Sequence, residues 1–426
     1  MSFIIKDVDA FQVFDSRGIP TIEVVIGLSG GAEGRFIVPS GKSTGMYEAL
    51  ELRDGGKELG GKTVHKAISN ILNEIAPAIT GMDARGQAAL DKVMIDLDGT
   101  PNKTRLGANA ILGCSAAACW AAANQEGVPL YKHIRDLAVT RGGSGEIGMP
   151  EIMAQMFGGG AHAEDSVDVQ CYSVRPIGFK SGEAAYIACL EVWLKEQEIY
   201  QELGRPLSFA DEGGLWPTDF ENNEEGLKLM VEAMKRAGFV PWENMGITLD
   251  IASSEFYDEE TGTYKLRYDK KELTSDEMVD YLADWVEKYP IVSIEDGCAE
   301  NDWEGQIALT KRLGDKIQLI GDDAFTTNLG RLKKGVELGA LNAILIKMNQ
   351  IGSMTETIDT ILYAQEHGYN PVVSGRSGDC EDVTQIHLAV GTNSYQLKIG
   401  GVCRSERVVK WNEIIRIEHS EAWKNR

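Results

Sequence analysis

MGITLD at residues 245–250 opens a pattern that recurs through the C-terminal half of the chain: a short β-branched run ends in an ionisable residue, and an amphipathic segment follows. The later runs are IVSIED (291–296), IQLIGDD (317–323), AILIKMN (343–349), PVVSGRS (371–377) and YQLKIGG (395–401). Their ends lie 24 to 27 residues apart after a first interval of 45 residues. Parallel strands buried on both faces are continuously apolar and alternate with helices, so the pattern predicts a β/α barrel.

Ionisable side chains at the carboxyl ends of these runs should converge at one mouth of the barrel. They are Asp250, Glu295, Asp322, Lys347 and Lys398. One carboxylate alone could simply cap the next helix. Three on successive strands would repel one another unless a hard divalent cation neutralised them, and an all-oxygen set without a Cys/His cluster favours Mg²⁺.

The composition limits the partners and the compartment. The 426 residues carry a formal net charge of −23, which argues against nucleic acid or an anionic membrane as a partner. An anionic substrate would have to be captured by local positive groups. Seven scattered cysteines without a CxxC motif indicate reduced thiols, and the N-terminus MSFIIKDVDAF has no signal-peptide pattern. We therefore expect a cytoplasmic protein.

The chain is too long for one small core, so two domains are expected. Residues 4–40 alternate in polarity between Gly-containing turns and predict a three-stranded antiparallel meander, whereas the periodicity from about residue 48 to residue 124 is helical. This pattern predicts an α+β cap domain, residues 1–140, followed by a barrel domain, residues 141–426, joined at the Gly-rich segment 141–148. PEIMAQM (150–156) and VDVQCYSVRP (167–176) predict two adjacent strands, so the barrel should begin irregularly.

Longer motifs distributed along the whole chain resemble those of the enolase (phosphopyruvate hydratase) family. They include VPSGKSTG (38–45), LDGTPNKTRLGANAILG (97–113), GGGAHAEDSVDVQ (158–170), ADEGG (210–214), KYPIVSIEDG (288–297), GRSGDCEDVT (375–384) and RSERVVKWN (404–412). The resemblance implies an α+β cap before a ββαα(βα)₆ barrel, usually in a homodimer. It also implies the dehydration of 2-phosphoglycerate to phosphoenolpyruvate with Mg²⁺, with two ions per active site when substrate is bound.

The resemblance further implies roles in metal binding and proton removal. Asp250, Glu295 and Asp322 would bind the first Mg²⁺, and Ser43, in a lid at residues 39–45, would help to bind the second. Lys347 would be the base that removes the proton α to the substrate carboxylate. Metal and neighbouring cations are expected to lower the pKa of this lysine, whereas an ordinary salt bridge to a carboxylate is the alternative interpretation.

The remaining implied roles concern the substrate. Glu212 would be the general acid that protonates the departing 3-hydroxyl, and His162 would lie over the substrate. Lys398 would contact the substrate carboxylate, while Arg376 and Ser377 would bind its phosphate. The alternatives are a solvated loop position for Arg376 and a purely structural imidazole for His162.

Some positions depart from the family pattern inside otherwise matching motifs. Cys171 replaces a second active-site glutamate, Gly375 replaces a histidine, and Phe157 replaces an asparagine. Losing the glutamate removes a like charge and weakens the case for a protonated Glu212 near neutral pH. Losing the imidazole should leave a cavity, in which a larger substrate with an additional carboxylate could pair with Lys42 of the lid.

The expected ligand is thus a small anionic phosphorylated or phosphonylated hydroxy acid, with 2-phosphoglycerate first. One alternative is an enolase-like dehydratase of a phosphonate analogue, as in the carboxyphosphonoenolpyruvate synthases. Another is a non-catalytic relative that keeps the fold and the metal, although retention of the lysines and carboxylates argues against it. An enolase-superfamily racemase or sugar-acid dehydratase is disfavoured, because those relatives lack this lid and the ADEGG and GRSG motifs.

Overall fold

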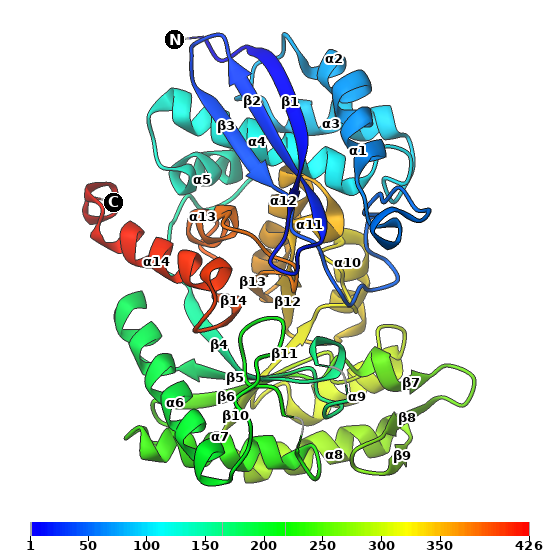
Figure 1. Ribbon diagram of the computed structural model, residues 1–426, viewed down its shortest axis with the longest axis vertical. Coiled ribbons are helices and arrows are strands. Elements are labelled where there is room, and N and C mark those ends of the chain that lie inside the picture. Colours follow the sequence, from blue (N-terminus) through cyan, green and yellow to red (C-terminus); the bar gives the residue numbers. More distant parts are fainter. Residues whose placement is uncertain (1, 164, 218, 426) are drawn as a thin grey trace.

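The computed structural model describes residues 2–163, 165–217 and 219–425 (Figure 1). Its N-terminal part carries an antiparallel sheet of order β1-β2-β3, formed by β1 (Ile5–Phe14), β2 (Pro20–Leu28) and β3 (Glu33–Ile37). This sheet is drawn in blue at the top of Figure 1. The predicted antiparallel meander is confirmed.

One face of this sheet packs against α4 (Ala108–Glu126), an alanine-rich helix that is almost entirely buried. Ile22, Val24 and Ile26 of β2 are fully buried. A Cβ atom at Gly34 would lie 2.1 Å from the backbone nitrogen of Ala121. Small residues are therefore needed on both elements, because helix and sheet backbones approach so closely.

The other helices of this part are α1 (His65–Asn70), η2 (Ile71–Ile75), α2 (Ala76–Ile79), α3 (Gln87–Asp98) and α5 (Leu130–Thr140). The prediction that helical structure begins near residue 48 is wrong, since the first α-helix begins at His65. Irregular chain and the short η1 (Glu58–Gly61) precede it. Gly55, Gly56, Gly60 and Gly61 all have positive φ, a backbone conformation that a right-handed helix does not contain.

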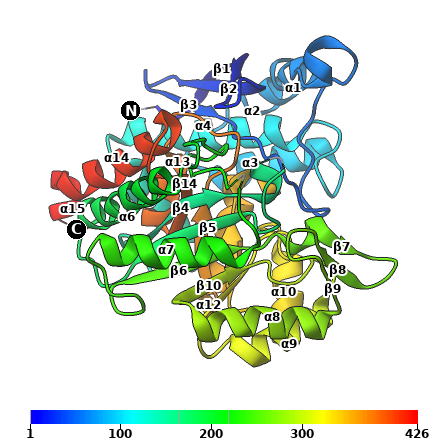
Figure 2. The same cartoon turned by 60° about the horizontal axis from the view of Figure 1, so that its bottom comes forward.

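The C-terminal part forms a closed barrel with strand order β10-β11-β12-β13-β14-β4-β5-β6 (Figure 2). The strands are β4 (Glu151–Gly158), β5 (Cys171–Pro176), β6 (Met245–Asp250), β10 (Ile291–Glu295), β11 (Gln318–Gly321), β12 (Ala343–Ile346), β13 (Asn370–Ser374) and β14 (Gln396–Gly401). β5 runs antiparallel to β4 and β6, whereas the other neighbours are parallel. The predicted irregular start is confirmed, and it brings the beginning of β5 to the same mouth as the ends of its neighbours.

Helices cover the outside of the barrel (Figure 2). They are α6 (Gly182–Glu202), α7 (Glu224–Arg236), α8 (Ser275–Lys288), α9 (Trp303–Leu313), α10 (Leu329–Leu338), α12 (Met354–Glu366), α13 (Thr384–Gly391), α14 (Ser405–His419) and α15 (Glu421–Lys424). The short α11 (Met348–Ile351) instead follows the carboxyl end of β12 and contacts α4. A small added sheet of β7 (Tyr257–Asp258), β8 (Thr263–Leu266) and β9 (Lys271–Leu273) lies between β6 and α8. This insertion explains the long first interval in the repeating pattern.

The N-terminal part contacts the barrel near the carboxyl ends of its strands. Ser40 and Gly378 exchange two backbone hydrogen bonds of 2.8 and 2.9 Å, and the Asp91 carboxylate of α3 accepts one from the Thr355 amide of α12 at 2.9 Å. Residues 39–45 are thereby held over the barrel mouth. Within the described residues, every helix is either too short or too polar to cross a membrane.

Candidate active site

The predicted strand-end residues meet at one mouth of the barrel. Asp250 and Glu295 are the last residues of β6 and β10 and lie side by side in the sheet register. Asp322 and Lys347 directly follow β11 and β12, and Lys398 lies within β14. These side chains are largely buried. The regular strand–helix period therefore places acidic and basic groups together inside a low-dielectric site.

Lys398 joins two of the carboxylates. Its Nζ atom lies 2.8 Å from Asp250 Oδ2 and 2.6 Å from Glu295 Oε2. Gln170 also donates to Asp250 Oδ2, at 3.2 Å. Burial, followed by the charge of Asp250, raises the pKa of Glu295 well above its usual value. One lysine therefore does not balance both acids fully.

Lys347 forms an ion pair with Asp322, whose other oxygen accepts a hydrogen bond from Gln350 Nε2 at 2.7 Å. Burial, the largest single influence, would lower the pKa of Lys347, but the carboxylates around it, Asp322 foremost and Glu295 next, together outweigh it and the pKa is raised. The expected lowering depends on bound metal and stays a prediction. The lysine makes the salt bridge to a carboxylate that was its alternative interpretation.

The donor set fits Mg²⁺. Asp250, Glu295 and Asp322 offer only oxygen ligands, the type that this hard cation prefers. Glu295 Oε1 is buried and, among the described residues, has no hydrogen-bond partner. Such an orphaned oxygen in a site of excess negative charge is suited to a cation. A further group of buried carboxylates, Asp296 and Asp323 with Asp322, has ligand atoms within 4.8 Å of one another.

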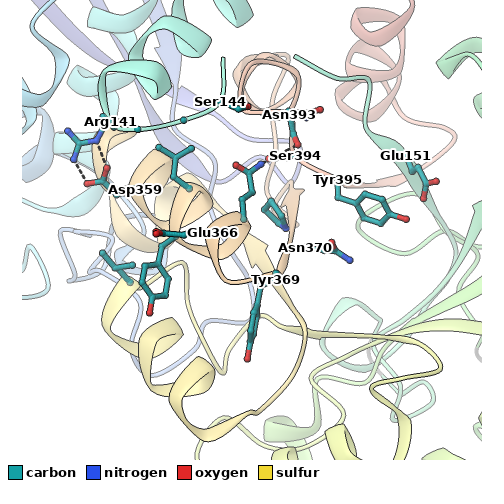
Figure 3. A pocket seen from close by; sticks show the side chains of 18 of the residues that line it. Arg141, Ser144, Glu151, Asp359, Glu366, Tyr369, Asn370, Asn393, Ser394 and Tyr395 are labelled. Atoms are coloured by element: carbon teal, nitrogen blue, oxygen red, sulfur yellow. Dashed lines mark hydrogen bonds and ion pairs between the residues drawn. The ribbon is translucent and has the colours of Figure 1, made fainter. Parts of the chain in front are cut away.

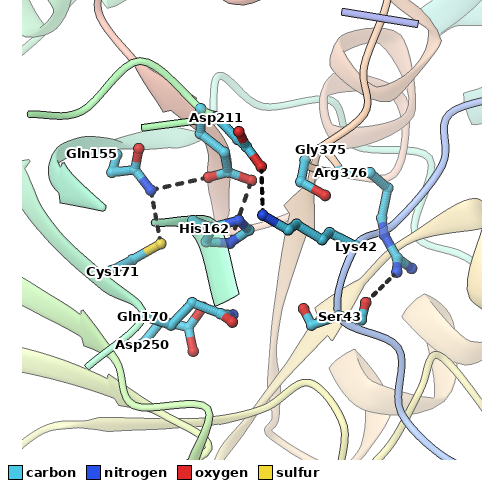
Figure 4. A network of polar contacts seen from close by, with 12 residues as sticks. Lys42, Ser43, Gln155, His162, Gln170, Cys171, Asp211, Asp250, Gly375 and Arg376 are labelled. Carbon is cyan, nitrogen blue, oxygen red and sulfur yellow. Dashed lines mark hydrogen bonds and ion pairs between the residues drawn. The ribbon is translucent and has the colours of Figure 1, made fainter. Parts of the chain in front are cut away.

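The opposite side of the mouth is built from different side chains (Figure 4). Gln155 of β4 donates from Nε2 to Cys171 Sγ at 2.9 Å and to Glu212 Oε2 at 3.2 Å. His162, in the η3 turn (Gly160–His162), places Nε2 3.9 Å from Glu212 Oε1. His162, Cys171 and Glu212 are all buried. They come from the irregular first hairpin of the barrel and from the loop that follows α6.

Glu212 is held toward its ionised form. Burial alone would raise the pKa of Glu212, but the positive charges around it, His162 foremost, lower it below its usual value. Burial lowers the pKa of His162 and raises the pKa of the Cys171 thiol. This direction agrees with the expectation that losing the family's second glutamate makes Glu212 harder to protonate.

Arg376 and Ser377 follow β13 and are buried, which rules out a solvated position for Arg376. The Arg376 guanidinium donates to Glu48 Oε2 at 3.0 Å and to the Ser43 carbonyl at 2.9 Å. Ser377 Oγ accepts a hydrogen bond from Arg17 at 3.4 Å. Guanidinium donors directed at one end of the site suit a phosphate group.

The lid lies closed over the site. Lys42 Nζ lies 3.3 Å from Asp211 Oδ2, which ties the lid to the loop beside Glu212 (Figure 4). A Cβ atom at Gly41 would lie 1.7 Å from Arg376 Nη2, so this lid position requires glycine. The enclosed cavity measures about 20 Å³, enough for roughly one water molecule.

Comparison with known proteins agrees with this geometry. Residues 5–134 match the enolase N-terminal domain, and residues 146–424 match the enolase C-terminal TIM barrel domain. Enolase 1 of Desulfitobacterium hafniense (strain Y51) is 56% identical over 418 residues, which cover 98% of this chain and 94% of that protein. The chain belongs to the enolase family.

The departure from the enolase pattern at Gly375 does not open the expected cavity. A Cβ atom at Gly375 would lie 2.8 Å from Asp379 Oδ2. The Asp379 carboxylate is fixed there by Arg407 at 3.3 Å and by Lys410 at 3.0 Å. The prediction of a vacated space is therefore wrong. Because Lys42 pairs with Asp211, this closed form does not favour a larger substrate with an additional carboxylate.

The departure at Phe157 has a packing explanation. Its ring lies 5.2 Å from that of Phe220, 5.6 Å from that of Tyr200 and 6.2 Å from that of Tyr172, measured between centroids. Phe157 is fully buried in this aromatic cluster. The substitution therefore fills an apolar layer rather than changing a contact to substrate.

Sequence analysis assigned no role to Gln155, Gln170, Gln350 and Glu48, all of which contact predicted site residues. A signal existed for Gln155, because it is the only amide in a strand that is otherwise apolar after its first residue. Glu48 carried no such signal, since it lies in an irregular segment of the cap.

A larger groove of about 1220 Å³ lies elsewhere (Figure 3). It is lined by the first residues of β4 and β13, Glu151 and Asn370, by Tyr395 just before β14, and by the Arg141–Asp359 ion pair. These residues mark the amino-terminal ends of the strands. Barrel enzymes carry their active sites at the carboxyl ends, so the groove is not the catalytic site.

Proposed function

We propose that the protein is a magnesium-dependent hydro-lyase that interconverts 2-phosphoglycerate and phosphoenolpyruvate. The observation that carries the proposal is the convergence of Asp250, Glu295 and Asp322 with Lys347 and Lys398 under a closed lid, in a chain 56% identical to Enolase 1. The reaction removes the proton on C2 and, with a proton from the acid, the hydroxyl on C3, so that the net loss is one water molecule.

Asp250, Glu295 and Asp322 would hold one Mg²⁺, and Ser43 would contribute to a second when substrate is bound. Bound magnesium supplies positive charge where the substrate carboxylate gains negative charge. Lys398 adds a cation of the chain itself at this end, and its position between Asp250 and Glu295 supports its role as the contact for the substrate carboxylate. The role of each residue is part of the proposal.

Lys347 is the proposed base for the proton on C2. To accept a proton its amine must be uncharged, and the Asp322 partner acts against this. The nearby positive charges of Arg376 and Lys398 act in the other direction and lower the pKa of Lys347. The opposing effects of these neighbours determine the fraction of enzyme molecules in which the Lys347 amine is uncharged and can accept a proton.

Glu212 is the proposed acid that gives a proton to the departing 3-hydroxyl. Gln155 fixes one carboxylate oxygen, and His162 lies near the other, from where it would lie over a bound substrate. Arg376 and Ser377 would bind the phosphate, which would compete with Glu48 for the guanidinium. Closure of the lid excludes water from the site, which strengthens each of these electrostatic contacts.

The proposal is tested by mixing the purified protein with 2-phosphoglycerate and Mg²⁺ and following the ultraviolet absorbance of phosphoenolpyruvate. We expect turnover that requires Mg²⁺ and stops after chelation. Folded protein that forms no phosphoenolpyruvate would contradict the assignment. The same assay with the phosphonate analogue of 2-phosphoglycerate measures whether Cys171 and Gly375 have changed the preferred substrate.

We further propose a homodimer in the cytoplasm, with residues 1–140 as the cap domain and residues 141–426 as the barrel domain. The family supports the dimer, and the end of α5 at Thr140 supports the division. Light scattering on the purified protein measures the oligomeric state, and a monomer at assay concentration would contradict the dimer.

A further inference from the structure

The side chain that sets this chain apart from its family, Cys171, lies among groups that bind soft metals. One ligand atom each from His162, Cys171 and Glu212 lies within 4.8 Å of the others. All three residues are at least 92% buried, with relative exposures of 6%, 1% and 8%. We call these three residues the thiol cluster. It is separate from the three carboxylates assigned above to Mg²⁺.

The contacts of the thiol cluster leave ligand capacity unused. Cys171 Sγ accepts a hydrogen bond from Gln155 Nε2 at 2.9 Å, and the same amide nitrogen donates to Glu212 Oε2 at 3.2 Å, so that one amide holds the sulfur and the carboxylate near each other. His162 Nε2 faces Glu212 Oε1 across 3.9 Å, too far for a hydrogen bond. His162 Nδ1 is buried without a hydrogen-bond partner among the described residues. The imidazole and carboxylate are thus adjacent but not bound to each other.

The chemistry of this donor set differs from that of the carboxylate side. Thiolate and imidazole are softer ligands than oxygen and favour Zn²⁺ over Mg²⁺. In a tetrahedral zinc site the ligand atoms lie about 3.3 to 3.6 Å apart. The His162–Glu212 distance of 3.9 Å exceeds this by about half an ångström, and the 4.8 Å limit for the whole cluster exceeds it by at most about 1.5 Å, so the side chains must move closer to bind the metal. His162 and Glu212 also line the substrate cavity, so a fourth position would open toward it.

We propose that His162, Cys171 and Glu212 form a zinc-binding site that inhibits the enzyme by occupying its acid group. Binding exchanges the thiol proton for the metal: Zn²⁺ gains a sulfur ligand and one proton is released to solvent. Lys398 opposes a cation nearby, and its ion pairs with Asp250 and Glu295 offset only part of this repulsion. The inhibition rests on the proposed function, whereas the metal site itself does not.

The site is tested directly with Co²⁺, a spectroscopic substitute for zinc, added in the presence of excess Mg²⁺. Coordination by a thiolate gives a sulfur-to-cobalt charge-transfer band in the near ultraviolet, which oxygen ligands do not give. We expect this band in the parent protein, its displacement by Zn²⁺, and its loss in Cys171→Ser. Cys119→Ser is the control and should keep the band, since Cys119 is also buried but lies in α4, outside the cluster.

Absence of the band in the parent protein, or its survival in Cys171→Ser, would overturn the proposal. Thermal unfolding of Cys171→Ser shows whether the variant is folded. If it is not, Cys171→Ala is measured instead, and a retained band there has the same meaning. This result does not depend on whether the protein turns over 2-phosphoglycerate.

The inhibition is tested by titrating Zn²⁺ into the assay at saturating Mg²⁺ and substrate. We expect the zinc concentration for half inhibition to rise at least about tenfold in Cys171→Ser, because even residues that only support metal ligands alter affinity by this amount. Equal sensitivity of the two proteins would contradict the inhibitory role. A protein without turnover but with the cobalt band would instead contradict the proposed function and leave the site standing.

Discussion

The two sides of the barrel mouth balance their charges in different ways. One side, which we call the carboxylate side, contains Asp250, Glu295 and Asp322; the other, the acid side, contains the proposed general acid Glu212. On the carboxylate side, Lys347 and Lys398 lie within ion-pair distance of the carboxylates. On the acid side, Glu212 accepts a hydrogen bond from the neutral amide of Gln155 and, among the described residues, its nearest basic partner is His162 at 3.9 Å. The first side is therefore a tightly coupled charge cluster, whereas the second depends on one carboxylate whose environment a single substitution can change.

The largest expected effect comes from the carboxylate side. Lys347→Ala removes the proposed base, and we expect kcat to fall by about 10² to 10⁴-fold, the range that general acid–base catalysis contributes. The measurement is the rate of phosphoenolpyruvate formation with saturating Mg²⁺. Lys92→Ala, which breaks an exposed ion pair with Asp96, is the matched control and should leave kcat unchanged. If Lys347→Ala kept full turnover, Lys347 would not be the base, and the carboxylate side would have no proposed role in proton removal.

Because Lys347→Ala also leaves Asp322 without its cation, its stability needs a separate measurement. Breaking a buried ion pair by removing one partner costs about 3–5 kcal/mol. We expect the thermal midpoint to fall without metal and to recover when Mg²⁺ is added. A folded variant with a recovered midpoint and low kcat separates loss of the base from loss of the fold.

The second prediction concerns stability of the metal-free protein against pH. The pKa of Glu295 in the folded chain is raised well above 4.5 by burial and by Asp250. The folded state then holds more protons than the unfolded state above about pH 4.5, so stability falls as pH rises through the folded pKa. Glu295→Gln removes this titration, and the fall should become shallower by up to about 1.4 kcal/mol per pH unit.

Thermal unfolding in chelator across the acidic to neutral range measures this effect. The fall should not vanish, because burial also raises the pKa of Asp296 and Asp323. Mg²⁺ should stabilise the parent protein and have a much weaker effect on Glu295→Gln. If stability depended on pH in the same way in both proteins, Glu295 would not have a raised pKa in the folded chain.

The two sides also differ in how far their residues could be predicted from the sequence. Asp250, Glu295 and Asp322 were found because each ends or follows an apolar run of constant period, and a parallel barrel brings such positions together. Glu212 and His162 carry no period, since they lie on the loop after α6 and in the η3 turn. Only the resemblance of ADEGG and GGGAHA to family motifs identified them as candidates.

Other features of the site lay beyond any local pattern. The space near Gly375 is filled by Asp379, which Arg407 and Lys410 of α14 hold in place. The packing beside Gly375 therefore depends on a carboxylate four residues later in the chain and on two basic side chains from α14. A sequence comparison position by position detects the missing imidazole but not the carboxylate that lies against Gly375.

A third prediction sharpens the comparison from the acid side. Cys171→Glu returns a carboxylate near Glu212, and the like charge should raise the pKa of Glu212. A general acid works only while protonated, so activity falls as pH rises through its pKa. The alkaline limb of kcat/KM should therefore move to higher pH, with a gain of several-fold in rate on that limb. Cys171→Gln, similar in size but uncharged, should leave the limb in place.

The same pH profiles also test whether Glu212 is the group that sets the alkaline limb. An unmoved alkaline limb in Cys171→Glu, with the variant folded, would mean that another group controls it. Lys398 on the carboxylate side, which must stay protonated to contact the substrate carboxylate, would then be the first candidate, and the pH profile of Lys398→Ala would not show the limb.

The smallest expected effect lies where the lid joins the acid side. Lys42 and Asp211 are each about a third exposed, at 38% and 31%, so their 3.3 Å pair contributes at most about 1 kcal/mol. Lys42→Ala should raise KM by about fivefold or less and leave kcat nearly unchanged, because the pair holds the lid and does not touch the reacting atoms. Added salt should reduce the difference, since exposed pairs are screened.

A double-mutant cycle with Asp211→Asn decides whether the pair itself is responsible. If Lys42 acts through Asp211, the double variant should have nearly the KM of either single variant, because each removes the same contact. Additive effects on KM, or a fall in kcat as large as the rise in KM, would show that Lys42 acts on the substrate instead. In that case the charge near Glu212 would be set partly by Lys42 of the lid. The acid side would then also rely on a nearby lysine, as the carboxylate side does.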